Sequence, residues 1–140
     1  MRANGSQSGF TLIELVVVIT ILGILAAFAI PRFASLEVDA RTAARDALGG
    51  SVRSGAALSH ALWLAQGQPA TVTMEGQTIT MTNGYPNLAT VNLTIGDLTG
   101  FTYTAGTGVF LKTGGAATCT ITYAAAPANG APTITNGGVC

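Results

Sequence analysis

The chain has 140 residues, which is the length of one domain. Six basic and six acidic side chains give a net formal charge of zero, and only 9% of the residues are charged. With no basic patch to neutralise phosphates, the composition argues against nucleic acid as a main partner. After Arg53 the only charged residues are Glu75, Asp97 and Lys112, so we expect most of the surface of that part to be neutral.

Residues 10–30 form an apolar run in which Glu14 is the only charged residue. As an α-helix these 21 residues would be about 31 Å long, close to the thickness of the hydrocarbon core of a bilayer. A carboxylate inside lipid costs about 2.5–3.5 kcal/mol on insertion scales. Glu14 is therefore either a residue of the membrane anchor that is tolerated near the membrane–water interface, or a group that pairs with a positive charge supplied by another copy of the chain.

The run opens with Gly9-Phe10-Thr11-Leu12-Ile13-Glu14. This segment resembles the N-terminus of type IV prepilins and of type II secretion pseudopilins, in which a short polar leader ends in Gly before Phe-Thr-Leu-Ile-Glu and an apolar helix. The resemblance implies that prepilin peptidase cuts between Gly9 and Phe10 and that the new Phe10 amine is N-methylated. Because the apolar stretch follows the predicted cut, the mature protein would keep its helix, unlike a protein with a secretory signal peptide.

The same resemblance implies that subunits polymerise through this helix into a homopolymeric filament. We expect Glu14 to face the Phe10 amine of a neighbouring subunit there, which would set orientation and axial register more than net stability. Two alternatives stay open: a contact with the subunit's own amine, which would help insertion, and a merely tolerated anchor residue.

The predicted domains are a leader at 1–9, a transmembrane or filament-core half of the helix at 10–31, and a globular domain at 32–140. Apolar and small residues recur at helical spacing beyond residue 31, and Gly67 predicts the end of a single helix of about 55 residues. Gly23 and Pro31 bracket a weak segment of it. They predict either a mild kink or, by resemblance to assembled pilins, local loss of helix in the filament.

From residue 70 the apolar periodicity changes to two, which predicts β-strands. A hairpin is expected from strands 71–74 and 77–81 around Glu75-Gly76, followed by strands at 101–104, 109–112, 119–123 and 133–135. Asn83-Gly84-Tyr85-Pro86 predicts a turn, and the following residues up to 100 predict a short helix or an irregular loop. The expected fold class is α+β, with one long N-terminal helix packed on a small antiparallel sheet, as in the pilin fold.

The two cysteines are Cys119 and Cys140, the latter being the last residue of the chain. In a reducing compartment they would more often be unrelated thiols, whereas in an exported domain of this size they predict one disulfide. The resemblance supports the pairing, since type IV pilins commonly end in a disulfide-bounded segment.

No catalytic, cofactor-binding or metal-binding cluster is indicated. His60 and Trp63 lie on the predicted helix, where a lone His is more often packed or exposed to solvent than catalytic and a Trp is more often a core residue. One His and two paired Cys do not make a zinc site of the usual kind. We therefore expect that the protein is not an enzyme and that it binds neither a cofactor nor a metal ion.

The layout of residues 83–86 and 119–140 resembles the mannose-sensitive haemagglutinin class of type IV pilins. The leading hypothesis is a type IV pilus subunit that contacts prepilin peptidase and the inner-membrane assembly machinery, and then leaves the inner membrane of a Gram-negative bacterium for its surface. The alternatives are a type II pseudopilin and a monomeric membrane-anchored binding module. One signal is contrary: Arg32 and Arg41 follow the apolar run whereas only Arg2 precedes it, which by charge alone would keep the domain in the cytoplasm.

Overall fold

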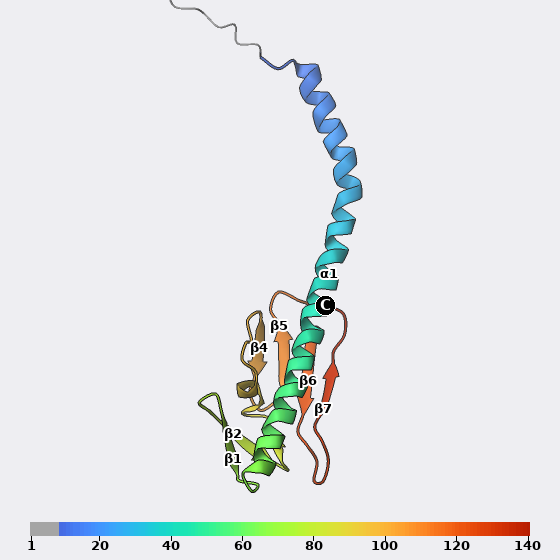
Figure 1. Cartoon of the computed structure of the whole chain (residues 1–140). Helices are drawn as coiled ribbons and strands as arrows, with labels where there is room; N and C mark the ends of the chain where they lie inside the picture. Colours follow the sequence, from blue (N-terminus) through green and yellow to red (C-terminus); the bar gives the residue numbers. More distant parts are fainter. Residues whose placement is uncertain (1–8) are drawn as a thin grey trace, which may run out of the picture. The chain divides into compact units, whose positions relative to one another are not determined.

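The computed structural model describes residues 9–140, so the predicted leader lies outside the described residues except for Gly9. Its longest element is the helix α1, Leu12–Ala65, with 54 residues (Figure 1). This confirms the single long helix that the apolar periodicity predicts. The chain forms two compact units, the first ending at Glu37 and the second covering Val38–Cys140.

The helix α1 ends where the glycine signal predicts. Gly67 has a φ of 79°, which places it in the left-handed region that closes helices. The amide of Gln68 donates to the carbonyl of Trp63 over 2.9 Å, and the amide of Gly67 donates to the carbonyl of Leu64 over 3.3 Å. These two bonds are those of a Schellman motif, which satisfies carbonyls that the last helical turn leaves without partners.

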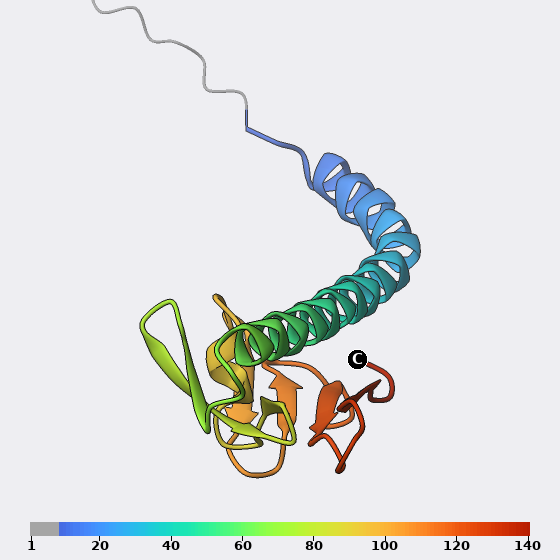
Figure 2. The ribbon, with the colours of Figure 1, turned by 60° about the horizontal axis from the view of Figure 1, so that its bottom comes forward.

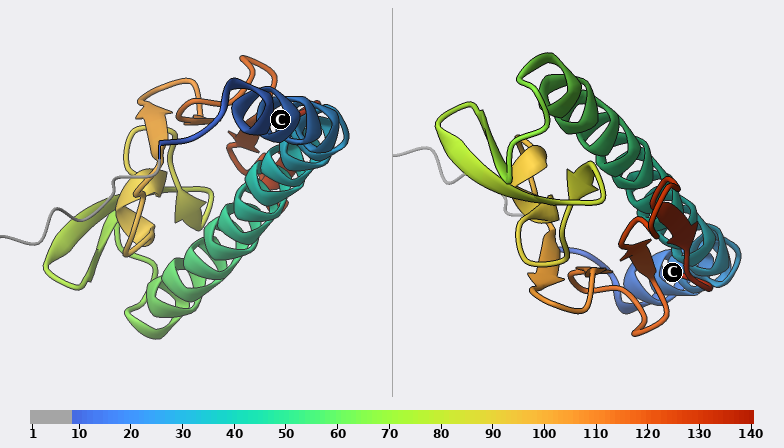
Figure 3. Two further views of the ribbon diagram at one scale, coloured as in Figure 1. Left: turned by 90° about the horizontal axis from the view of Figure 1, so that it is seen from above. Right: turned by 90° about the horizontal axis from the view of Figure 1, so that it is seen from below.

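The main core of the second unit lies between α1 and a four-stranded sheet. Leu48, Val52 and Ala56 of α1 are spaced four residues apart, so they share one face of the helix. This face packs on buried side chains of the sheet and of the loop before it: Val91, Phe110, Ile121 and Tyr123. Within this unit both sheets lie on the same side of α1 (Figures 2 and 3). Two large apolar side chains of this part of the helix, Leu58 and Leu64, are exposed.

The first sheet has the strand order β1-β2-β3 and is antiparallel throughout. Its strands are β1, Thr71–Met74, β2, Gln77–Thr82, and β3, Tyr85–Pro86. The β1–β2 turn is Glu75-Gly76 and the β2–β3 turn is Asn83-Gly84, and all four residues have a positive φ, as two-residue hairpin turns of the mirror-image type require. Val72, Ile79 and Met81 form a second, smaller core cluster against the end of α1.

The second sheet is an antiparallel meander in the order β4-β5-β6-β7. Its strands are β4, Phe101–Thr104, β5, Val109–Lys112, β6, Thr120–Ala124, and β7, Thr133–Asn136. In β6, Ile121 and Tyr123 are buried while the alternate threonines are half-buried, which is the pattern of a sheet with one face on the core.

The α+β class is confirmed, but two details differ from the sequence-based expectation. The strands form two separate antiparallel sheets rather than one. Of the predicted turn at residues 83–86, only Asn83-Gly84 is a turn, since the next two residues pair as β3. The poorly predicted stretch that follows contains a 3₁₀-helix, η1, Val91–Thr94, which supplies Val91 to the main core.

Candidate functional site

The apolar N-terminal part of α1 is exposed along its whole length. Fourteen large apolar side chains between Phe10 and Ile30 are exposed, from Val16 at 44% to Phe10 at 93%. The most apolar 18-residue window of α1 has a mean hydropathy of 2.8, and none of that window is buried by the described chain. The segment is thus long and apolar enough to cross a bilayer, and it lacks an intramolecular partner among the described residues.

Glu14 has a local structural role that the sequence interpretation missed. Its carboxylate accepts hydrogen bonds from the backbone amide of Thr11 over 2.9 Å and from the Thr11 hydroxyl over 2.8 Å. The Glu14 amide in turn lies 3.3 Å from the Thr11 hydroxyl oxygen, which accepts from it. This is a capping box, in which a Thr before the helix and a Glu three residues later satisfy each other's free amides. The Thr-x-x-Glu spacing at 11–14 was the signal that could have revealed it.

The predicted cleavage site lies directly before this cap. Gly9 and Phe10 have no regular secondary structure, and both are exposed. A side chain at Gly9 would meet no heavy atom within 4 Å, so nothing in the described chain obstructs this position. The site is therefore accessible to an enzyme approaching from outside the chain.

The two predicted weak points lie inside regular helix. Gly23 and Pro31 both belong to α1, which is α-helical across them. They follow Glu14 by nine and 17 residues, or about 13 and 25 Å along the helix axis at 1.5 Å per residue. The structure thus groups Gly9, Phe10 and Glu14 at the start of the helix and places Gly23 and Pro31 progressively farther from them. Loss of helix at this segment stays a prediction.

The predicted disulfide is present. Cys119 and Cys140 are bonded, with 4.5 Å between their Cα atoms, and both are buried. Closing a loop with a sequence separation of 21 stabilises a fold by about 3 kcal/mol in the chain-entropy picture.

A buried arginine also holds the segment that precedes Cys140. Arg45 on α1 donates from Nη1 to the carbonyls of Gly137 over 3.0 Å and Gly138 over 2.6 Å. Its Nε and Nη2 donate to Asp46 Oδ1 over 3.0 and 2.9 Å, and Asn136 donates to the same oxygen over 2.7 Å. The sequence pattern did not single out Arg45, because its carbonyl partners are more than 90 residues away in the chain.

The comparisons with known proteins agree with this layout. The model of the prokaryotic N-terminal methylation motif matches residues 4–30. The type IV narrow pilus major component PilA5 of Thermus thermophilus is 53% identical over 59 residues, which are 42% of this chain and 47% of the relative. The chain thus spans about half the length of the curated relative it matches. No solved structure matches the chain. Over these stretches the chain is therefore similar to proteins with the prokaryotic N-terminal methylation motif and to a type IV pilus component.

Proposed function

We propose that the chain is a structural subunit of a type IV pilus rather than an enzyme. In this proposal prepilin peptidase cuts after Gly9, residues 10–31 hold the subunit in the inner membrane, and the assembly machinery then polymerises it into a surface filament. The observation that carries the proposal is the exposed apolar run at residues 10–30, which lies within the match to the methylation motif. The Gram-negative cell and the haemagglutinin subclass stay predictions from resemblance; the matched relative comes from Thermus.

The cost of leaving this run in water explains why it must find partners. Burying a large apolar side chain is worth about 1.5–3 kcal/mol, so the fourteen exposed ones represent roughly 20–40 kcal/mol. Lipid can cover them before assembly, and the same helices of neighbouring subunits can cover them in a filament. A patch of this size on a protein marks a membrane or protein interface.

Cleavage would give Glu14 a second role besides the cap. The new Phe10 amine would be a positive charge four residues before Glu14, in a site that excludes water once the filament forms. An incoming subunit could bring its amine to the Glu14 of its neighbour, and the gain in orientation would exceed the gain in net stability, because desolvation offsets much of the attraction.

Three variants separate the two roles. Glu14→Gln keeps a group that can complete the capping box but removes the charge, Glu14→Leu removes both, and Thr11→Val removes the cap hydroxyl but keeps the charge. If the charge drives assembly, both Glu14 variants should be inserted and cleaved but form few filaments, while Thr11→Val should assemble. Microscopy and immunoblots of the sheared surface fraction measure filaments, and membrane fractionation measures insertion.

The other outcomes are equally definite. Normal filaments from Glu14→Gln but not from Glu14→Leu would assign Glu14 to the helix cap alone. Normal filaments from both variants would make Glu14 a tolerated anchor residue and leave assembly to apolar packing. Processing is tested separately with Gly9→Arg, which should retain the leader in an intact-mass measurement because a side chain before the cut would crowd the peptidase.

The disulfide favours a pilus over a secretion pseudopilus. Major pseudopilins of type II secretion, the other group that the N-terminal motif resembles, usually carry a calcium-binding C-terminal loop. This chain instead has a disulfide between Cys119 and Cys140. Electron microscopy of sheared filaments, with mass spectrometry of their subunit, distinguishes a surface pilus from a short pseudopilus and from a monomeric anchored module. Absence of this chain from sheared filaments would contradict the proposal.

A further inference from the structure

The described part of the chain contains three asparagine–glycine pairs: Asn83-Gly84, Asn129-Gly130 and Asn136-Gly137. Such a pair can react internally, because the backbone nitrogen of the glycine can attack the side-chain carbonyl carbon of the asparagine. Glycine has no Cβ to obstruct this approach, and its backbone turns easily toward the side chain. The attack requires that no other group holds the glycine amide and the asparagine side chain in place. The three pairs differ in this respect.

The pair at Asn136 is held on both sides. The Asn136 side chain donates from Nδ2 to Asp46 Oδ1 over 2.7 Å, and the amide of Gly137 donates to the carbonyl of Thr120 over 2.8 Å. The carbonyl of Gly137 also accepts from Arg45 over 3.0 Å. Attack by the Gly137 nitrogen would have to break the first two of these bonds. The pair is therefore protected while the C-terminal segment stays in place.

The pair at Asn83 is held by its side chain and by packing. Nδ2 of Asn83 donates to the carbonyl of Ala126 over 2.8 Å. Gly84 lies against two rings, since a Cβ at this glycine would be 2.9 Å from Trp63 and 3.2 Å from His60. The paired strands β2 and β3 directly flank the turn. The Asn83 side chain therefore cannot rotate toward the next amide without losing a bond and disturbing a packed turn.

The pair at Asn129 is the least restrained of the three. Asn129 is exposed on the loop between β6 and β7, and its side chain makes no hydrogen bond to the described residues. The amide of Gly130 donates over 3.1 Å to the carbonyl of Pro127, which closes a tight turn. The φ of Asn129 is 61°, a value that asparagine tolerates in turns. Attack by the Gly130 nitrogen has to break only this one bond in an exposed turn.

We propose that Asn129 is a site of spontaneous deamidation in the folded protein. The nitrogen of Gly130 forms a bond to Cγ of Asn129, and the bond from Cγ to Nδ2 breaks. Ammonia leaves with the proton that the Gly130 nitrogen gives up, and a succinimide ring remains. Water then opens the ring at either of its carbonyls, which gives aspartate or, with the backbone routed through Cγ, isoaspartate. The only co-reactant is water. This goes beyond the proposed pilus function, because it depends on the globular unit alone.

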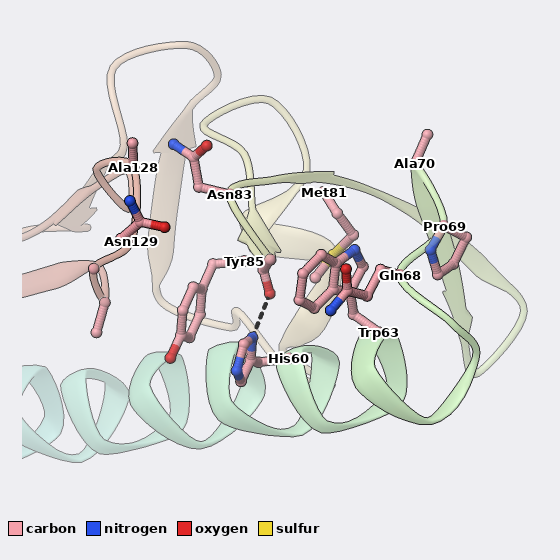
Figure 4. A pocket seen from close by; sticks show the side chains of 13 residues that line it. His60, Trp63, Gln68, Pro69, Ala70, Met81, Asn83, Tyr85, Ala128 and Asn129 are labelled. Carbon is pink, nitrogen blue, oxygen red and sulfur yellow. Dashed lines mark hydrogen bonds between the residues drawn. The ribbon is translucent and has the colours of Figure 1, made fainter.

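The product would change the charge of its surroundings. Asn129 lies in the wall of a hollow of about 660 Å³ beside the C-terminal end of α1 (Figure 4). Among the described residues that line this hollow there is no Asp, Glu, Lys or Arg. A carboxylate at residue 129 would be the first acidic group of this wall. It would also add one negative charge to a chain whose formal net charge is zero.

Mass spectrometry of the full chain in detergent micelles tests the proposal. The folded protein is incubated at neutral pH in water enriched in heavy oxygen, so that each ring opened during the incubation takes up one labelled oxygen. The chain is then reduced and digested at acidic pH, and fragmentation before Pro132 separates residue 129 from residue 136. We expect Asn129 to be labelled at least about fivefold faster than Asn83 and about tenfold faster than Asn136, because the latter two must lose further hydrogen bonds. Raising the pH by one unit should speed the reaction about tenfold, since the attacking nitrogen must lose its proton.

Two controls separate the effect of structure from that of sequence. The same chain, reduced and unfolded in denaturant, should label its three pairs at similar rates, because each asparagine is followed by glycine and none is held. Asp46→Ala removes the acceptor of the Asn136 side chain in the folded protein. This variant should label residue 136 at least about fivefold faster than the parent and leave the rate at residue 129 unchanged.

Asn129→Gln is the matched variant at the site itself. Glutamine keeps the amide but must close a larger ring, and Gln68 shows that this chain accepts glutamine at a φ of 65°. Isoelectric focusing after incubation should show an added acidic band in the parent protein and a much weaker one in Asn129→Gln.

Three results would overturn the proposal. They are the absence of label at residue 129 in the folded chain, labelling of Asn83 or Asn136 as fast as that of Asn129, and an order of rates in denaturant equal to that in the folded chain. Circular dichroism of each variant shows that its fold is kept. None of these results bears on the filament assay, so the deamidation site and the pilus proposal stand or fall separately.

Discussion

Replacing Arg45 by Met should loosen the segment that leads to Cys140 without unfolding the domain. Two hydrogen bonds from the guanidinium to the carbonyls of Gly137 and Gly138 are lost. Bonds to charged groups contribute about 1.5–3 kcal/mol each, but both glycines are exposed, so water can replace part of the loss. Asp46 is half exposed and its carboxylate returns to water at little cost. We expect a net loss of about 2 kcal/mol.

Hydrogen exchange measures this loss where it occurs. The amides to follow are those of β7 and of Gly137, whose N–H donates to the carbonyl of Thr120 over 2.8 Å. When exchange proceeds through local opening, 2 kcal/mol corresponds to about 30-fold faster exchange. The disulfide is kept intact in both proteins, so the covalent tether is the same. Amides of the β1–β2 hairpin, which Arg45 does not contact, should exchange at unchanged rates.

Arg53→Met is the matched control for Arg45→Met. Arg53 is exposed and makes one longer bond, from Nη2 to the carbonyl of Ile134 over 3.2 Å, so its removal should cost well below about 1 kcal/mol. Equal exchange rates in the two variants, or no acceleration in Arg45→Met, would refute the reasoning that burial makes Arg45 the stronger contact.

Three further predictions concern the rest of the globular unit. Reducing the bond between Cys119 and Cys140 should lower the free energy of unfolding by about 3 kcal/mol in denaturant titrations with and without reductant, and equal midpoints would contradict it. Gly84→Ala should cost about 1–3 kcal/mol more than Gly76→Ala, because both sites have a positive φ but only the first is crowded. Burial raises the pKa of Tyr123, so its stabilising contribution is complete below about pH 10 and is lost as the pH rises further. An alkaline unfolding series of Tyr123→Phe should show a smaller loss than the parent, and parallel curves would contradict this.

Local patterns in the sequence were sufficient to predict the long helix, its end and the first hairpin turn. The apolar run and the spacing of small residues predicted α1, since a helix of that length needs only a periodic pattern and an end signal. The end at Gly67 and the turn at Glu75-Gly76 were predicted because glycine tolerates a positive φ that other residues resist. The motif at Gly9–Glu14 carried the resemblance to type IV prepilins. The capping box within it was equally local and was missed only because Glu14 was considered as a charge rather than as a hydrogen-bond acceptor.

Only the tertiary structure decided how distant segments meet. The division of the strands into two sheets depends on which edges pair, and alternation of threonines along a strand does not specify its neighbour. The two carbonyls that Arg45 binds, those of Gly137 and Gly138, lie more than 90 residues away, so its burial could not follow from the charge pattern of the helix. The stacking of His60 on Tyr85, and the position of Asn129 in the lining of the same hollow, also depend on tertiary packing. Each residue comes from a different segment, and only packing of the β2–β3 turn and the loop before β7 against the end of α1 brings them to one place.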